Sequence, residues 1–201
     1  MKYPKLNYDA TQVAPRIGKM IVLNGPMNTG KTHILNFVCS KLVEVKKWTR
    51  IYSVSKTENN RQEGAYKLAD IRKGKTIWDR GLVLTNGENT IFILTPGDIL
   101  HKSANEDWYA FDYAMSDVFM QPHKELEGID KFDLVVCACR SLNRRQSVKA
   151  EINKSYGDKI VRRFSTMRVK GVTERMNYWE SKADKIIEKI EEVLFVPSCV
   201  E

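Results

Sequence analysis

The stretch that decides the fold is Gly25-Pro26-Met27-Asn28-Thr29-Gly30-Lys31-Thr32. It matches the pattern G-x-x-x-x-G-K-[ST] at every fixed position. Glycine lets the backbone curl without a Cβ clash, so that several N–H groups can point at one anion. A helix that begins at the end of such a loop adds the positive end of its dipole. The pattern therefore indicates a phosphate-binding loop.

The residues on both sides of the loop have the order that this pattern requires. Residues 19–23 form a short apolar run that predicts a strand buried on both faces. After Thr32 the apolar residues recur with helical spacing, at Ile34, Leu35, Val38, Leu42 and Val45. Strand, loop and helix therefore follow one another.

With this motif in this context, the chain resembles the P-loop (Walker A) NTPases over residues 19–46. The resemblance implies that Lys31 reaches the β- and γ-phosphate oxygens of a nucleotide and that the Thr32 hydroxyl joins the coordination shell of Mg²⁺. It also implies a set of nucleotide-binding residues: Gly25, Pro26, Met27, Asn28, Thr29, Gly30, Lys31, Thr32 and His33.

The remaining strands and helices alternate along the chain. Asn86-Gly87 between two apolar runs predicts a β-hairpin over residues 82–94, because both residues tolerate positive φ. Further strands are predicted at 50–55, 134–139 and 159–168. Helices are predicted at 104–120, 143–154 and 173–195, the last of them amphipathic.

This alternation indicates an α/β fold, a three-layer sandwich with a mostly parallel central sheet like that of the P-loop NTPases. We expect one domain over 1–201, with an N-terminal extension at 1–18, because no linker divides the chain.

Residues that follow the strands are the candidates for chemistry, since ligands of parallel sheets bind beyond the carboxyl ends of the strands. Asp98 is the first choice for the acid that orients Mg²⁺, although Thr95, Pro96 and Gly97 separate it from its strand; the alternatives are Glu58 and an Asp that only caps a turn. Arg140 ends a strand and would neutralise phosphate charge, or is simply a solvated Arg. The predicted catalytic residues are Lys31, Asp98 and Arg140, and the metal ligands are Thr32 and Asp98.

The lengths of the apolar runs and the spacing of the cysteines indicate which kind of protein this is. The apolar runs are too short for a membrane helix, and residues 1–18 do not read as a signal peptide, so a cytoplasmic protein without membrane contact is expected. Cys137 and Cys139 lie two apart in an apolar strand and are predicted to be core thiols on one face, rather than metal ligands.

The net charge of +8 lies in one region. Residues 140–175 carry eleven Lys and Arg against three acids, whereas residues 98–133 carry nine acids against three Lys. The basic region favours a phosphate-rich partner or an acidic protein, and its alternative is a solvated face.

The function expected from these features is binding of Mg·ATP followed by hydrolysis or γ-phosphoryl transfer. ATP is preferred over GTP because the sequence has no N-K-x-D signature; the nearest look-alike, Ser181-Lys182-Ala183-Asp184, lies inside the predicted last helix. Two alternatives stay open. One is a kinase of a small phosphorylated metabolite or nucleotide, which would engage its acceptor through residues 56–75 or through Arg140, Arg144 and Arg145. The other is a nucleotide-gated module that binds nucleic acid or protein through residues 140–175.

Overall fold

The computed structural model describes residues 8–54, 66–74, 80–95, 111–141 and 147–195. Six strands in these ranges form one sheet in the order β2-β3-β4-β5-β1-β6. The strands are β1 (Ile17–Gly25), β2 (Thr49–Val54), β3 (Gly81–Thr85), β4 (Thr90–Leu94), β5 (Phe132–Arg140) and β6 (Ile160–Ser165).

The helices of the described ranges connect these strands. The α-helices are α1 (Ala10–Val13), α2 (Lys31–Glu44), α4 (Leu68–Arg72), α5 (Phe111–Met120), α6 (Val148–Tyr156) and α7 (Val172–Phe195). Three 3-10 turns complete the list: η1 (Ala14–Arg16), η2 (Lys124–Leu126) and η3 (Gly157–Lys159).

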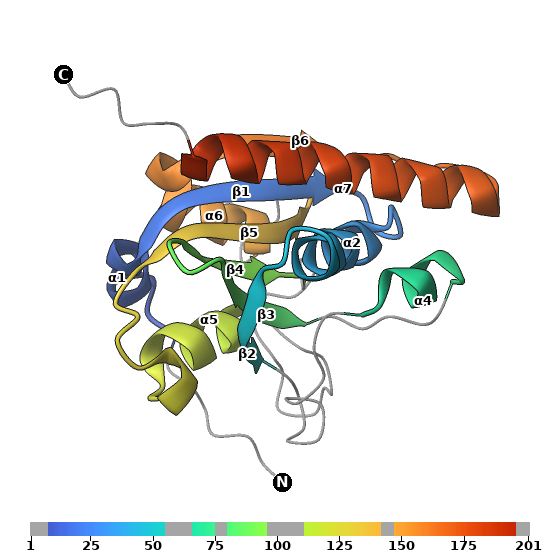
Figure 1. Ribbon diagram of the computed structural model, residues 1–201. Coiled ribbons are helices and arrows are strands. Elements are labelled where there is room, and N and C mark those ends of the chain that lie inside the picture. The colour runs from blue at the N-terminus through green and yellow to red at the C-terminus, as the bar shows by residue number, and fades with distance from the viewer. Residues whose placement is uncertain (1–7, 55–65, 75–79, 96–110, 142–146, 196–201) are drawn as a thin grey trace, which may run out of the picture.

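Five of the six described strands run in the same direction. β1 pairs in parallel with β5 and β6, and β4 pairs in parallel with β5. β3 is antiparallel to both of its neighbours, β2 and β4. The carboxyl ends of β1, β2, β4, β5 and β6 therefore lie at the same end of the strands, and Figure 1 shows the arrowhead of β1 pointing to the right.

Helices cover both faces of the sheet, which gives three layers (Figure 1). Successive residues of β1 alternate between two buried clusters. Met20 and Val22 pack with α1, α5 and α6, whereas Ile21 and Leu23 pack with α2, α4 and α7. This period of two is expected of a strand, and burial on both faces explains why these strands read as continuous apolar runs. The expected α/β architecture with a mostly parallel sheet is confirmed.

The predicted strands are all present, with shifted ends. β1 is longer than residues 19–23 at both ends, and Lys19 points outward to donate to the Val193 carbonyl oxygen. The hairpin over 82–94 is confirmed as β3 and β4. Its turn uses Asn86 differently from our expectation. Gly87 has φ of +96°, but Asn86 is not among the residues with positive φ, and its side chain instead accepts hydrogen bonds from the N–H groups of Glu88 and Asn89.

Of the helix predicted over 143–154, residues 143–146 lie outside the described residues, and α6 confirms the part over 148–154. The helix observed there, α6, begins at Val148, because Ser147 adopts an extended conformation and its hydroxyl caps the helix by accepting from Ala150 N. α7 confirms the helix predicted at 173–195, and α5 confirms the described part of the helix predicted at 104–120. Cys137 and Cys139 are buried in the same cluster, as their spacing predicted.

Described parts of the acidic and basic regions, α5 with η2 and β6, lie at opposite edges of the sheet. At the β2 edge, the Tyr52 hydroxyl donates to the Asp117 carboxylate of α5 over 2.8 Å, and η2 follows α5 closely. β6, with the exposed Arg162 and Arg163, forms the other edge. Within the described part of the chain, no helix is both long and apolar enough to cross a membrane.

Candidate functional site

The 25–32 loop joins a central strand to a helix. β1 ends at Gly25, residues 26–30 turn, and α2 begins at Lys31. Two residues of the turn have left-handed backbone conformations, Asn28 with φ of +60° and Gly30 with φ of +83°. Asn tolerates this region better than most residues, and Gly adopts it without strain. The sequence therefore permits the tight reversal between strand and helix.

Side chains from outside the loop leave no room for a Cβ at either glycine of the motif. A Cβ on Gly25 would lie 1.7 Å from the Thr166 hydroxyl oxygen, and a Cβ on Gly30 would lie 2.0 Å from Nε1 of Trp179. Thr166 directly follows β6, and Trp179 belongs to α7. The loop is thus enclosed by the segment that runs from the end of β6 into α7.

Lys31 is buried and its ammonium group turns back to the loop. Its Nζ donates to the Gly25 carbonyl oxygen over 3.1 Å and to the Pro26 carbonyl oxygen over 2.8 Å. These bonds hold the positive charge at the loop, beside the N-terminus of α2. A phosphate is a stronger, charged acceptor than a peptide carbonyl, so the same ammonium is positioned to exchange one kind of acceptor for the other.

Thr29 is the buried residue of the turn, at 2 % exposure. Its hydroxyl donates to the Pro26 carbonyl oxygen over 2.9 Å and lies 2.6 Å from the Thr166 hydroxyl. The Thr29 carbonyl oxygen accepts from Nε1 of Trp179 over 3.2 Å. Thr29 therefore ties the loop to both β6 and α7.

Arg140 is brought to the loop by the register of the sheet. It pairs with Gly25 across β5 and β1, and its Nη2 donates to the Met27 sulfur over 3.2 Å. The next residue, Ser141, donates its N–H to the Gly25 carbonyl oxygen. The carboxyl-end rule used on the sequence therefore predicts this proximity correctly.

The loop lies where the connections of two neighbouring strands diverge. The chain leaves β1 for α2 on one face of the sheet, and it leaves β5 for α6 on the other face. In open α/β sheets this divergence opens a crevice beyond the carboxyl ends, which is the usual place for a ligand. Gly25 at the end of β1 and Arg140 at the end of β5 border this point of divergence.

The other predicted site residues divide into two groups. Thr32 and His33 lie in the first turn of α2. His33 stacks on Trp179, with ring centroids 4.3 Å apart. Burial lowers the pKa of the His33 imidazole below its ordinary value of 6.5, and the charge of Arg175 lowers it further. Asp98, Glu58, Arg144 and Arg145 lie outside the described residues, as does most of the 56–75 segment.

The residues present fit an anion better than a bare metal ion. Lys31, Arg140 and the dipole of α2 bring positive charge to one place. Among the residues that the structure describes, no three His, Cys, Asp or Glu side chains gather to hold a metal. Thr32, one of the two predicted metal ligands, lies in the first turn of α2, and the other, Asp98, lies outside the described residues.

The sequence reasoning missed Thr166 and Trp179. Thr166 follows the carboxyl end of β6, so the rule that selected Arg140 also applies to it. Trp179 fits the apolar period of α7 and reads there as a core residue. Only the packing of α7 beside α2 reveals its polar contact with the loop.

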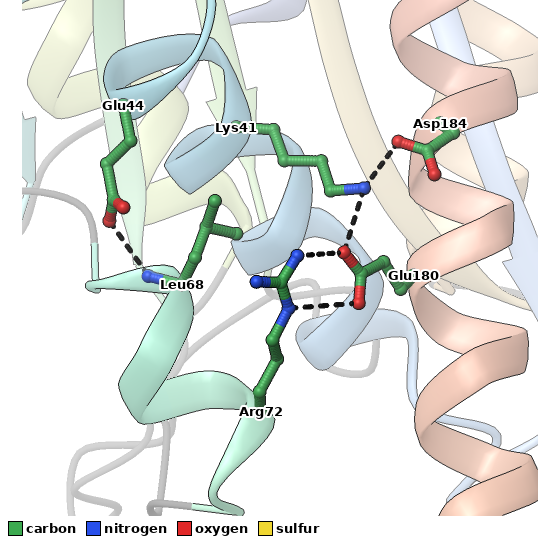
Figure 2. A network of polar contacts seen from close by, with 6 residues as sticks. All are labelled: Lys41, Glu44, Leu68, Arg72, Glu180 and Asp184. Carbon is green, nitrogen blue, oxygen red and sulfur yellow. Dashed lines mark hydrogen bonds and ion pairs between the residues drawn. The ribbon is translucent and has the colours of Figure 1, made fainter.

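An ion-pair network fixes α7 beside α2 and α4 (Figure 2). The Lys41 ammonium lies 3.0 Å from the Glu180 carboxylate and 2.5 Å from the Asp184 carboxylate. Arg72 of α4 donates from Nε and Nη2 to the same Glu180 carboxylate. The Arg72 hydrogen bonds come first among the causes that lower the pKa of Glu180, and the Lys41 charge adds to them. Glu180 is thereby kept ionised at neutral pH.

Comparison with known proteins gave no match, whether with protein families, with curated proteins or with solved structures.

Proposed function

We propose that the chain is a P-loop protein that binds Mg·ATP and hydrolyses it or transfers its γ-phosphoryl group. One observation carries the proposal: a complete G-x-x-x-x-G-K-[ST] loop lies between a central parallel strand and the N-terminus of a helix, at the point where strand connections diverge. Lys31 and Arg140 bring two positive charges to that point.

Each residue has a proposed role that follows from its chemistry. The backbone of residues 25–33 surrounds the phosphates, and Lys31 binds the β- and γ-phosphate oxygens. Arg140 neutralises charge on the transferred group, for which its planar fork is suited. Mg²⁺, when bound by Thr32 and the phosphates, supplies charge neutralisation at the reacting oxygens. Asp98 remains our proposal for the acid that orients the metal.

Two alternatives concern the step that follows nucleotide binding. Phosphoryl transfer to a small metabolite is the first alternative. A nucleotide-gated module is the second, and one observation favours it: Arg162, Arg163, Arg168 and Arg175 are all exposed. Rapid turnover with water alone supports an ATPase, turnover that requires an acceptor supports a kinase, and slow turnover with retained product supports a gated module.

Lys31→Ala tests the proposal directly. We expect at least a tenfold loss of Mg·ATP affinity by titration calorimetry, since hydrogen bonds to charged groups contribute about 1.5–3 kcal/mol each. The matched control is Lys131→Ala, which removes the same charge just before the amino end of β5, at the opposite end of the strands. Equal affinity of Lys31→Ala and the parent, or no binding by the parent, refutes the proposal.

A further inference from the structure

The indole of Trp179 contacts two residues of the loop, Thr29 and Gly30, and one residue of the first turn of α2, His33. Its Nε1 donates to the Thr29 carbonyl oxygen over 3.2 Å, and its ring stacks on His33. It also covers Gly30 so closely that no Cβ fits between them. The indole thus spans the junction between the loop and the first turn of α2.

The hydrogen bond to Thr29 fixes more than one atom. The peptide group between Thr29 and Gly30 is planar, and the structure contains no cis peptide bond in its described ranges. In a trans peptide the C=O and N–H bonds point in opposite directions. Because the Thr29 carbonyl points to Trp179, the Gly30 N–H points away from α7. A backbone N–H that would serve a phosphate therefore has its direction set by α7.

The indole itself is held on a rigid element. Glu180, the next residue, joins the network with Lys41 and Arg72 (Figure 2). Ala183, Ile186, Ile187 and Ile190 bury the following turns of α7 in the core. On the other side, the Tyr178 hydroxyl accepts from Met167 N, which ties the start of α7 to the β6–α7 connection. Trp179 therefore has little freedom to follow the loop if the loop moves.

We propose that Trp179 is a positioning residue of the phosphate-binding loop, which orients the Thr29–Gly30 peptide and the His33 ring and so raises the affinity for nucleotide phosphates. This inference rests on the proposed function for its ligand. The contact between Trp179 and the loop is present in the nucleotide-free protein. The positioning role and the proposed function can therefore be refuted separately.

The test compares two substitutions of the same kind. Trp179→Phe keeps an aromatic ring but removes the N–H donor. Trp48→Phe makes the same change in the same core cluster, in the segment that leads from α2 to the amino end of β2, away from the loop. Trp48 is 5 % exposed, so its variant controls for a general loss of stability.

The first measurement is hydrogen exchange of the backbone amides of residues 25–34 without nucleotide. Trp179→Phe is expected to speed this exchange, whereas Trp48→Phe leaves it as in the parent. The second is Mg·ATP affinity, which is expected to fall about threefold to tenfold in Trp179→Phe, the usual effect of losing one hydrogen bond, and to stay unchanged in Trp48→Phe.

A third readout belongs to Trp179 itself, one of four tryptophans in the chain. Mg·ATP is expected to change the emission of the parent and of Trp48→Phe, and to leave that of Trp179→Phe nearly constant. Unchanged loop exchange in Trp179→Phe, or equal loop exchange in the two variants, overturns the positioning role. Faster loop exchange in a protein that binds no Mg·ATP upholds the contact and overturns the proposed function alone.

Discussion

At the scale of single residues, the motif letters are predictable and their partners are not. Gly25 and Gly30 are recognisable from the pattern, whose glycines permit a curled backbone. The structure adds a second reason for each, since Thr166 and Trp179 occupy the space that a Cβ would need. These partners are 141 and 149 positions away in sequence. No local pattern carries that information, because it depends on how β6 and α7 are placed in the fold.

His33 gives the residue-scale prediction, a pH-dependent stability. The lowered pKa means that the folded protein binds a proton at His33 less readily than the unfolded chain does. His33 therefore does not reduce the free energy of unfolding at a pH above its ordinary pKa of 6.5. The free energy of unfolding falls as the pH decreases from 6.5 to the folded-state pKa of His33. For one proton the slope is at most about 1.4 kcal/mol per pH unit.

Chemical unfolding between pH 7.5 and pH 5 measures this dependence, and His33→Gln is expected to have the flatter profile. Arg175→Gln is the companion variant. Since burial is the larger cause and the Arg175 charge the smaller, we expect it to raise the His33 pKa only part of the way towards 6.5 in an NMR titration. Identical pH profiles of the parent and His33→Gln contradict the prediction.

At the scale of elements, strands were more predictable than helix ends. Burial on both faces makes β1, β4 and β5 read as short apolar runs, and their short length favours strands over buried helices. The apolar pattern did not mark Ser147 as the N-cap of α6, although its extended backbone and its hydroxyl, which accepts from Ala150 N, set this boundary. Leu68 and Ile71 bury one face of α4, and the ion pair of Arg72 with Glu180 adds a contact with α7 that leaves no periodic signal in the sequence.

The network around Glu180 yields the element-scale prediction (Figure 2). Glu180→Gln removes the negative charge that joins α2, α4 and α7, and we expect the free energy of unfolding to fall by about 1 kcal/mol at pH 7, near the upper end for partly exposed pairs. Because the folded-state pKa of Glu180 is lowered, this contribution is present above the ordinary value of 4.5 and is lost as the pH falls through the folded-state pKa.

The difference between the parent and Glu180→Gln should therefore shrink at acid pH and in high salt, which screens exposed charges. Glu191→Gln is the matched control on the same helix. Its partner is Lys46, and both side chains are more exposed than those of Glu180 and Lys41, so a smaller effect is expected. A difference for Glu180→Gln that stays the same at every pH and salt concentration would show that charge is not the cause.

At the scale of the whole molecule, the described parts of the acidic and basic stretches are separated in space as well as in sequence. The acidic stretch around α5 and η2 packs at the β2 edge, and the basic β6 forms the opposite edge. The sequence predicted this polarity only on the condition that the two regions occupy different faces. Strand order meets that condition, and strand order depends on contacts between residues far apart in the chain.

Arg162 and Arg163 of the basic region lie on opposite faces of β6, which a count of basic residues along the sequence does not show. Neighbouring residues of a strand point to opposite faces. Arg163 accordingly donates to Asn153 of α6, whereas the Arg162 guanidinium lies 5.5 Å from the ring centroid of Phe164, which packs on the cluster of α2 and α7. A nucleic acid on one face of this edge would thus contact one arginine more than the other.

The last prediction concerns that basic edge. If it binds nucleic acid, affinity measured by fluorescence anisotropy should fall steeply with salt, because each neutralised phosphate releases counterions. Reversing both charges, Arg162→Glu with Arg163→Glu, should remove binding without changing Mg·ATP affinity. Arg162→Glu alone and Arg163→Glu alone should weaken nucleic-acid binding to different extents. The variant with the larger loss of affinity identifies the face of the edge that binds. Lys124→Glu with Lys131→Glu is the matched control: it changes the net charge equally but acts on exposed lysines outside the basic edge, in the acidic 98–133 stretch.

If both double variants weaken binding equally, only overall charge matters. If the parent shows no association near physiological salt at protein concentrations of about 10⁻⁴ M, where non-specific binders already bind, the basic edge is a solvated face and the nucleic-acid alternative is refuted.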